Sequence, residues 1–199
     1  MKPSSGKRKQ KIVICVSGMT GSGKSTVAKR LAEEYGLKYL SGGGALKALA
    51  IESGYKPVEV GWWETDEGMK FLQERADDPR FDKRVDEKLL KLAKQGNVVL
   101  DSWTMPWLLK EGFKVWLEAS PDVRARRVAE RDSIGVREAS SLLKEKDERT
   151  KVIYKQLYGF NLGSNFSPFD LILDTEDLDA AEVFDAVCLV TNHLVMGKI

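Results

Sequence analysis

The sequence predicts a three-layer α/β fold in which a five-stranded parallel sheet lies between helices. Lys11–Ser17 is rich in β-branched residues and apolar without alternation, as is typical of a strand buried on both faces. Helical patterns separate this run from the later ones, and strands that alternate with helices pair in parallel through right-handed crossovers. The four further predicted strands are Leu37–Leu40, Asn97–Asp101, Phe113–Glu118 and Phe169–Asp174.

Glycine and capping residues mark where the predicted helices begin and end. The first helix spans Ser25–Tyr35, carries its apolar residues on one stripe, and is closed by Gly36. A later helix ends at Gly96, directly before the third strand. The last helix begins at Asp179 with Glu182 three residues on, which is a capping-box-like start.

Two long stretches interrupt the alternation of strands and helices. The first, 42–95, is mostly helical and rich in tryptophan and charge, and the second, 131–155, is a charged helical insert. Proline is too scarce for a linker, and no repeat or low-complexity segment occurs. We therefore expect one domain over 1–199, with a core at 11–41, 96–130 and 156–199 that carries two mobile attachments.

Composition excludes several classes of protein. Hydrophobic residues make up 42% and charged residues 31% of the 199 residues, which predicts a globular fold. No apolar run approaches the roughly 20 residues of a membrane helix. The basic segment Met1–Lys11 is not followed by an apolar stretch of signal-peptide length, so we do not expect secretion. Two cysteines are typical of a reducing cytoplasm, and a net charge of +2 is too slight to indicate a nucleic-acid partner. We expect a monomer. The basic segment Met1–Lys11 is expected to be a frayed, solvated tail, and the alternative is an RNA-contacting arm.

Gly18–Ser25 matches the phosphate-binding pattern G-x-x-x-x-G-K-[ST] between a predicted strand and a predicted helix. Its glycines let the backbone curl so that N–H groups point at phosphate oxygens, and the helix adds its positive N-terminal end. Lys24 is expected to reach the β- and γ-phosphates. The residues predicted to bind ATP are Gly18, Met19, Thr20, Gly21, Ser22, Gly23, Lys24, Ser25, Thr26 and, from a later helix, Arg124.

A magnesium site is predicted beside this phosphate-binding loop (P-loop). The hydroxyl of Ser25 is expected to ligate Mg²⁺ together with the nucleotide phosphates. The third strand is hydrophobic and ends in Asp101, at the place where a Walker-B-type acid holds the metal or its water. Ser25 and Asp101 are therefore the predicted metal residues.

Arginines recur on the helix that begins after Pro121. Arg124, Arg127 and Arg131 are spaced i, i+3, i+7 and share one face. Phosphoryl transfer develops charge that arginines clamp by bidentate hydrogen bonds, without a general base. We therefore predict Lys24, Arg127 and Arg131 as catalytic residues, the alternative being a solvated basic face. The later basic residues Lys144, Lys146 and Arg149 are each expected to pair with acidic helix neighbours, the alternative being that they close over the phosphates.

Beyond the P-loop, six stretches occur in a specific order and spacing: 35–42, 78–82, 94–100, 115–121 followed by its arginines, 154–159 and 169–175. In these, and in 16–32, the chain resembles the archaeal-type cytidylate kinases, a branch of the nucleoside monophosphate (NMP) kinases within the P-loop NTPases. The resemblance implies an NMP-binding insert at 42–95 and a lid at 131–155. It also implies that Arg127 and Arg131 are lid arginines, and that the substrates are ATP and an NMP.

The sequence departs from that family where the acceptor is expected to bind. After the second strand the family has an acid and an arginine, where this chain has Gly44 and Lys47. After the third strand the family has Glu-Gly-Arg, where this chain has Asp101, Ser102 and Trp103. Ser41, Lys47 and Trp103 are therefore the predicted acceptor-binding residues. Because this site has few arginines to bind a phosphate, we expect CMP to be a weak substrate.

Three functions fit these observations. The first is an ATP-dependent, magnesium-using kinase that phosphorylates CMP or dCMP. The second is a P-loop kinase of the same architecture that acts on another small acceptor or on an RNA hydroxyl. The third is a nucleotide-binding regulatory protein with little kinase activity. An intact donor site with altered acceptor positions is compatible with all three.

Overall fold

The computed structural model describes residues 11–58, 61–78 and 80–197, so nearly all of the basic segment Met1–Lys11 lies outside the described residues. Five parallel strands form one sheet in the order β2-β3-β1-β4-β5. The strands are β1 (Val13–Ser17), β2 (Lys38–Ser41), β3 (Val98–Asp101), β4 (Phe113–Glu118) and β5 (Leu171–Asp174). The five predicted strands and their parallel pairing are confirmed.

Helices account for the connections between the strands. The helices are α1 (Lys24–Glu34), α2 (Gly42–Glu52), the 3₁₀ helix η1 (Trp62–Glu64), α3 (Asp66–Asp77), α4 (Arg80–Ala93), α5 (Met105–Leu108), α6 (Pro121–Asp132), α7 (Val136–Tyr158) and α8 (Ala180–Leu194). The capping box that starts the last helix is confirmed, since the Asp179 carboxylate accepts from the N–H of Glu182 and the Glu182 carboxylate accepts from that of Asp179. None of the described helices is both long enough and apolar enough to cross a bilayer.

The apolar residues of the sheet pack on both of its faces. On one face, Ile14 and Val16 of β1 pack against α1 and α8 around Leu31 and Val187, all of them fully buried. On the other face, the fully buried Cys15 packs toward α2 and α4. A strand with alternate side chains in two cores has no solvated face, which explains its unbroken apolar sequence.

The carboxyl ends of the three neighbouring strands β2, β3 and β1 meet at one edge of the sheet. Register aligns Ser41 and Val16 with Asp101, one on either side. The P-loop follows β1 directly, and α2 follows β2 directly. Residues distant in sequence are thereby placed together where parallel sheets hold their ligands.

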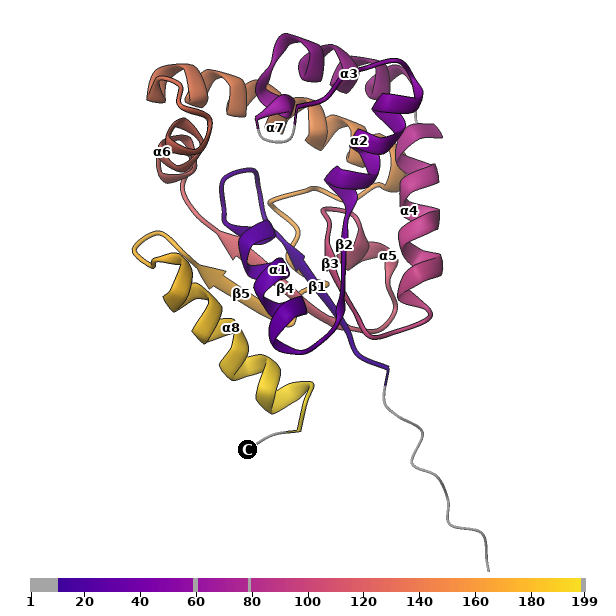
Figure 1. Ribbon diagram of the computed structural model, residues 1–199, viewed down its shortest axis with the longest axis vertical. Coiled ribbons are helices and arrows are strands. Elements are labelled where there is room, and N and C mark those ends of the chain that lie inside the picture. Colours follow the sequence, from indigo (N-terminus) through magenta and orange to yellow (C-terminus); the bar gives the residue numbers. More distant parts are fainter. Residues whose placement is uncertain (1–10, 59–60, 79, 198–199) are drawn as a thin grey trace, which may run out of the picture.

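Helices α3 and α7 lie above this edge and pack on one another (Figure 1). Arg149 of α7 donates to the Gln73 side chain of α3 at 2.9 Å. Arg75 of α3 donates to the Tyr154 hydroxyl of α7 at 3.3 Å. The segment predicted as a lid, 131–155, thus comprises the end of α6 and most of α7, which continues without a break to Tyr158.

Candidate active site

The P-loop has the backbone curl that its glycines predict. Gly18, Gly21 and Gly23 have φ angles of 152°, 84° and 88°, in the region that favours glycine. A Cβ at Gly21 would lie 2.8 Å from the carbonyl oxygen of Arg124, and one at Gly18 would lie 2.5 Å from that of Leu117. Space as well as conformation therefore requires glycine at the first two positions.

Two cavities open on either side of this loop. The first, of about 460 Å³, lies between the P-loop, α6 and the segment Thr175–Val183, and we call it the donor cavity. Its P-loop wall comprises Thr20, Gly21, Ser22, Gly23, Lys24, Ser25 and Thr26. Gly18 and Met19 stand apart from this wall. The Gly18 carbonyl accepts from the Trp103 indole, and Met19 packs in an apolar cluster with Trp116 and Leu162.

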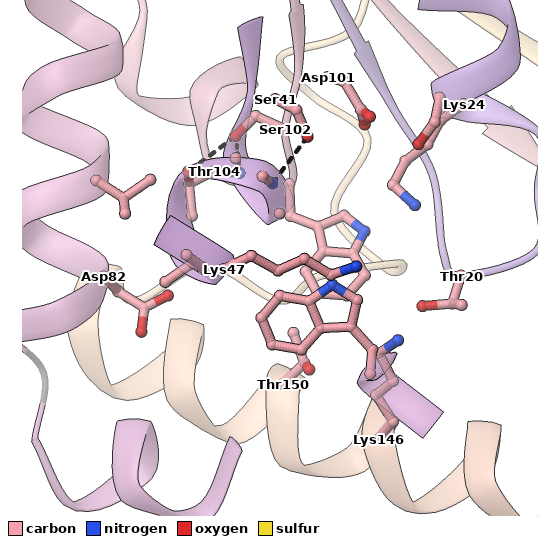
Figure 2. Close-up of a pocket in the computed structure, with 18 of the residues that line it drawn as sticks. Thr20, Lys24, Ser41, Lys47, Asp82, Asp101, Ser102, Thr104, Lys146 and Thr150 are labelled. Atoms are coloured by element: carbon pink, nitrogen blue, oxygen red, sulfur yellow. Dashed lines mark hydrogen bonds between the residues drawn. The ribbon is translucent and has the colours of Figure 1, made fainter. Parts of the chain in front are cut away.

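The second cavity, of about 430 Å³, lies between the P-loop, the strand ends and helices α2, α3, α4 and α7, and we call it the acceptor cavity (Figure 2). Four residues line both cavities: Thr20, Lys24, Ser25 and Arg131. A group held in one cavity therefore meets a group held in the other at these four side chains.

Lys24 and Asp101 form the polar floor where the cavities meet. Burial lowers the pKa of Lys24, an effect that the nearby Asp101 carboxylate opposes. One Asp101 oxygen accepts from the Tyr39 hydroxyl at 2.9 Å, and the side chain points into the cavity with Lys24 (Figure 2). The Lys24 ammonium suits a phosphate oxygen, whereas the Asp101 carboxylate repels phosphate and suits a cation bound with it.

The predicted magnesium residues have suitable chemistry but are few. Ser25 supplies a hydroxyl and Asp101 a carboxylate to the acceptor cavity. Among the described residues there is no group of three or more His, Cys, Asp or Glu side chains that would hold a metal alone. Mg²⁺ is commonly bound by one or two protein oxygens together with substrate phosphates and water, so the two residues fit a nucleotide-borne ion.

The three arginines of α6 have different partners. Arg124 is buried, donates to the Thr20 carbonyl of the P-loop at 3.1 Å, and pairs with Asp147 of α7 at 2.9 Å. Arg127 lines the donor cavity and donates to the side chain and carbonyl of Thr175. Arg131 lines both cavities and pairs with Asp132 and Glu64. Arg124 thus braces the loop from behind, while the other two face the cavities.

Lys146 departs from its expected pairing with helix neighbours. Its ammonium turns from α7 into the acceptor cavity and pairs with Glu64 at 2.5 Å, whereas Arg149 does pair with its neighbour Glu145. The expectation for Lys146 was wrong because η1 places a buried carboxylate opposite this face of α7. Glu64 therefore pairs with two cations that line the cavity, Lys146 and Arg131.

The three predicted acceptor-binding residues all line the acceptor cavity. The Ser41 hydroxyl caps α2 by accepting from the Gly44 N–H at 3.1 Å. Lys47 donates to the Val58 carbonyl at 2.9 Å. Trp103 donates its indole N–H to the Gly18 carbonyl at 2.6 Å, and its ring centroid lies 5.3 Å from the Lys24 ammonium. The three residues thus line one cavity, where Lys47 and Trp103 each donate a hydrogen bond to a main-chain carbonyl.

The far end of the acceptor cavity carries buried charges. Arg75 makes a bidentate ion pair with Asp82, at 2.6 and 3.1 Å. Asp86 accepts from the hydroxyls of Thr104 and Tyr158, each at 2.6 Å. Burial raises the pKa of Asp86 to about 6. This end of the cavity is therefore polar although it lies beneath the helices.

Comparison with known proteins identifies the family. The sequence profile of the cytidylate kinase-like family matches residues 13–177. The chain belongs to this family. The cytidylate kinase of Pyrococcus horikoshii is 35% identical over 94% of this chain and 91% of its own. That of Methanocaldococcus jannaschii is 31% identical over 92% of this chain and 99% of its own. This protein is a nucleoside monophosphate kinase.

Solved structures show the same fold in more distant kinases. The shikimate kinase of Bacteroides thetaiotaomicron superposes with a TM-score of 0.53, covering 93% of this chain and 99% of that one at 17% identity. A likeness at that identity concerns the fold alone. It confirms the P-loop kinase architecture that the strand order and the glycine loop predict.

Several residues of the kinase's acceptor cavity escaped the sequence analysis. Arg75, Asp82 and Asp86 lie on helices in the charged segment 66–93, where their spacing is that of ordinary solvated helix faces. The one available signal was the resemblance of residues 78–82 to the cytidylate kinases, which did not indicate a function for Asp82. Helix α7 contacts Arg75 and Asp86 through Tyr154 and Tyr158, which are 79 and 72 residues away in the sequence.

Proposed function

We propose that this kinase transfers the γ-phosphate of ATP, bound with Mg²⁺, to CMP or dCMP. The observation that carries the proposal is the shared wall of the two cavities. Thr20, Lys24, Ser25 and Arg131 line both. A triphosphate along the P-loop and a monophosphate in the acceptor cavity would therefore present their reacting groups at the same four side chains.

The residues at this meeting point supply positioning and charge. Lys24 would hold the β- and γ-phosphates, and the lid arginines Arg127 and Arg131 would clamp the charge that develops on the transferring group. Ser25 and Asp101 would hold the magnesium ion, which neutralises phosphate charge when bound. Placing two reactants in line accounts for much of the rate in such a reaction, and no general base is required.

The names of the relatives support cytidylate as the acceptor. The acceptor cavity supports it through its size and polar inner end, while its altered positions, Lys47 and Trp103, predict weak use of CMP. The P-loop supports ATP as the phosphate donor, because it matches its pattern at every fixed position.

The test is ADP release from purified protein with ATP and MgCl₂, with CMP, dCMP, UMP, AMP, GMP or no acceptor. We expect CMP and dCMP to stimulate release above the rate without acceptor, and omission of MgCl₂ to abolish it. Release that is equal in all arms would indicate an ATPase without an acceptor. Stimulation by AMP or GMP alone would assign a different acceptor.

A further inference from the structure

Glu64 is a buried carboxylate that bridges two cations from other helices. It lies in η1, and 4% of its side chain is exposed. Its Oε1 pairs with the ammonium of Lys146 on α7 at 2.5 Å, and its Oε2 pairs with the guanidinium of Arg131 on α6 at 3.1 Å. Phosphate oxygens bind lysine and arginine in the same way, through charge-assisted hydrogen bonds. Glu64 thus holds two side chains that would also suit a phosphate.

Both of these cations line the cavity in which the acceptor is proposed to bind. Lys146 enters the acceptor cavity from the side opposite Lys24 (Figure 2), and Arg131 lines it too. Burial lowers the pKa of Lys146, an effect that Glu64 opposes and that repulsion from Lys24 and Arg131 strengthens. Three positive charges therefore lie close together, with the Glu64 carboxylate among them.

The Glu64 side chain has space on both of its sides. Besides the acceptor cavity it lines a third cavity, of about 310 Å³, between η1, α6 and α7. Asp132 and Glu138 also line this third cavity. The Glu64 carboxylate can therefore leave its partners by turning toward the third cavity, where two acidic side chains repel it. Pairing with Lys146 is thus the favoured state when no other anion is bound.

We propose that Glu64 is an internal competitor for the acceptor's phosphate, which neutralises Lys146 and Arg131 until a phosphate dianion displaces it. The inference rests on the proposed function. A phosphate monoester carries a charge of about −1.5 to −2 at pH 7, whereas a carboxylate carries a single negative charge. Exchange of Glu64 for a phosphate therefore brings more negative charge to the cations, and exchange for a singly charged anion does not. Glu64 in this role admits phosphate esters at reduced affinity and excludes weaker anions.

The first experiment uses Glu64→Gln, which keeps the shape of the side chain and removes its charge. The KM for CMP, and the Kd of CMP measured by isothermal titration calorimetry without ATP, should both fall about tenfold, because the phosphate no longer competes with a carboxylate. The kcat should stay within about threefold, because in the unmodified protein saturating CMP has already displaced Glu64. Cytidine lacks the phosphate, so its Kd should stay within about twofold.

Two further variants separate the contact of Glu64 from its charge. Glu138→Gln removes an equal charge from an exposed carboxylate that lines the third cavity, and it should leave the KM for CMP within about twofold. Glu64→Asp keeps the charge but withdraws the carboxylate by about 1.5 Å, one carbon–carbon bond, so the two contacts cannot both persist. Its Kd for CMP should fall about threefold.

A double variant tests whether Lys146 is the cation that Glu64 withholds. In a Lys146→Met background the carboxylate has no ammonium to release, so adding Glu64→Gln should change the Kd for CMP by about threefold or less. A tenfold gain that persists in this background would mean that Glu64 acts on the acceptor without Lys146, which contradicts the proposed competition.

The outcomes separate this inference from the proposed function. If the unmodified protein phosphorylates neither CMP nor dCMP, the proposed function fails, and the Kd of CMP still decides the inference. If Glu64→Gln leaves that Kd unchanged or raises it, or if kcat falls while KM does not, Glu64 orients its cations and the competition is overturned. An equal gain for cytidine also overturns it. If Glu64→Gln does not fold, Glu64→Asp decides, and an unchanged Kd then contradicts the inference.

Discussion

The donor and acceptor sides of the site are built in different ways. The donor wall is largely one contiguous segment, residues 20–26, of a loop whose shape is set by three glycines with positive φ. The acceptor wall combines the ends of β2 and β3 with side chains from α2, η1, α3, α4 and α7. The first is encoded locally and the second only by tertiary packing.

The two sides also differ in how their positive charges are held. Lys24 lies on the wall of both cavities with its ammonium toward the Trp103 ring. On the acceptor side, Lys146 and Arg131 pair with Glu64, and Arg75 pairs with Asp82. An acceptor phosphate must therefore compete with carboxylates for these cations. Binding of a phosphate in the acceptor cavity therefore requires some of these ion pairs to open.

The largest expected effect follows from Lys24→Ala. It removes the charge directed at the transferring phosphoryl group and should lower kcat on the order of 10³-fold. The melting temperature should change little, because a charge whose pKa burial lowers is not a favourable folding contact. Steady-state kinetics and a thermal melt check both points. Turnover within a factor of a few of the unmodified protein would mean that the P-loop is not the chemical site.

A smaller effect is expected from Arg127→Ala and Arg131→Ala. Each should reduce kcat on the order of 10²-fold while weakening ATP binding much less, because the contacts of the proposed lid would tighten only as the site closes around the transition state. Arg126→Ala is the matched control, since Arg126 is exposed on the same helix. Equal losses in ATP affinity and rate would indicate ground-state binding, and kinetics like those of the control would make the arginines a solvated face.

The comparison is sharpened by Trp103→Arg, alone or with Lys47→Arg. A planar guanidinium at these positions offers a phosphate the bidentate contact that a lysine and an indole lack. The KM for CMP should fall about tenfold from a value that is high in the unmodified protein. Loss of the Trp103–Gly18 hydrogen bond should also weaken ATP binding slightly. A micromolar KM for CMP in the unmodified protein, with activity lost in the variants, would show that other side chains bind the phosphate.

The smallest expected effect concerns pH and Asp86. Burial raises the pKa of this carboxyl from 3.8 to about 6 among Thr104, Tyr158, Asp82 and Arg75. The folded state therefore holds the proton more tightly than the unfolded state, and its stability should rise as pH falls from 7 to 5. The gain attributable to Asp86 is about 1 kcal/mol, or about 2–4 °C in melting temperature.

Asp86→Asn supplies the control for that pH effect. Other carboxyl groups titrate in the same range, so the informative quantity is the difference in melting temperature between pH 5 and pH 7 for the two proteins. The variant should lack the contribution of Asp86, and its difference should be smaller or more negative. Identical differences in both proteins would show that Asp86 titrates as an ordinary exposed carboxyl.

Sequence predicted most of the fold and the donor side because their signals are local. The strand at Val13–Ser17 is almost entirely apolar. The P-loop needs glycines because of their positive φ angles and, at Gly18 and Gly21, because a Cβ would clash. Both features can be predicted from a few consecutive residues. Short α5 escaped prediction because Met105–Leu108 is one helical turn that contains Pro106 and is too short to show a periodicity.

The acceptor side was less predictable because its residues acquire their roles from distant partners. Lys146 has acidic neighbours on its own helix, which made a local ion pair the natural expectation, yet its partner Glu64 is 82 residues away. Arg124 shares a helical face with Arg127, but close packing turns it behind the P-loop toward Asp147. Spacing on a helix identifies a face and leaves open what covers it.

The central claim is that a donor and an acceptor nucleotide meet at Lys24, Ser25, Thr20 and Arg131. A bisubstrate compound in which adenosine and cytidine are joined through five phosphates tests it most directly by isothermal titration calorimetry. Because one molecule would fill both cavities, it should bind on the order of 10²-fold more tightly than ATP or CMP alone. Lys24→Ala should abolish most of that gain. Binding no tighter than that of ATP would contradict the claim that the two cavities form one transfer site.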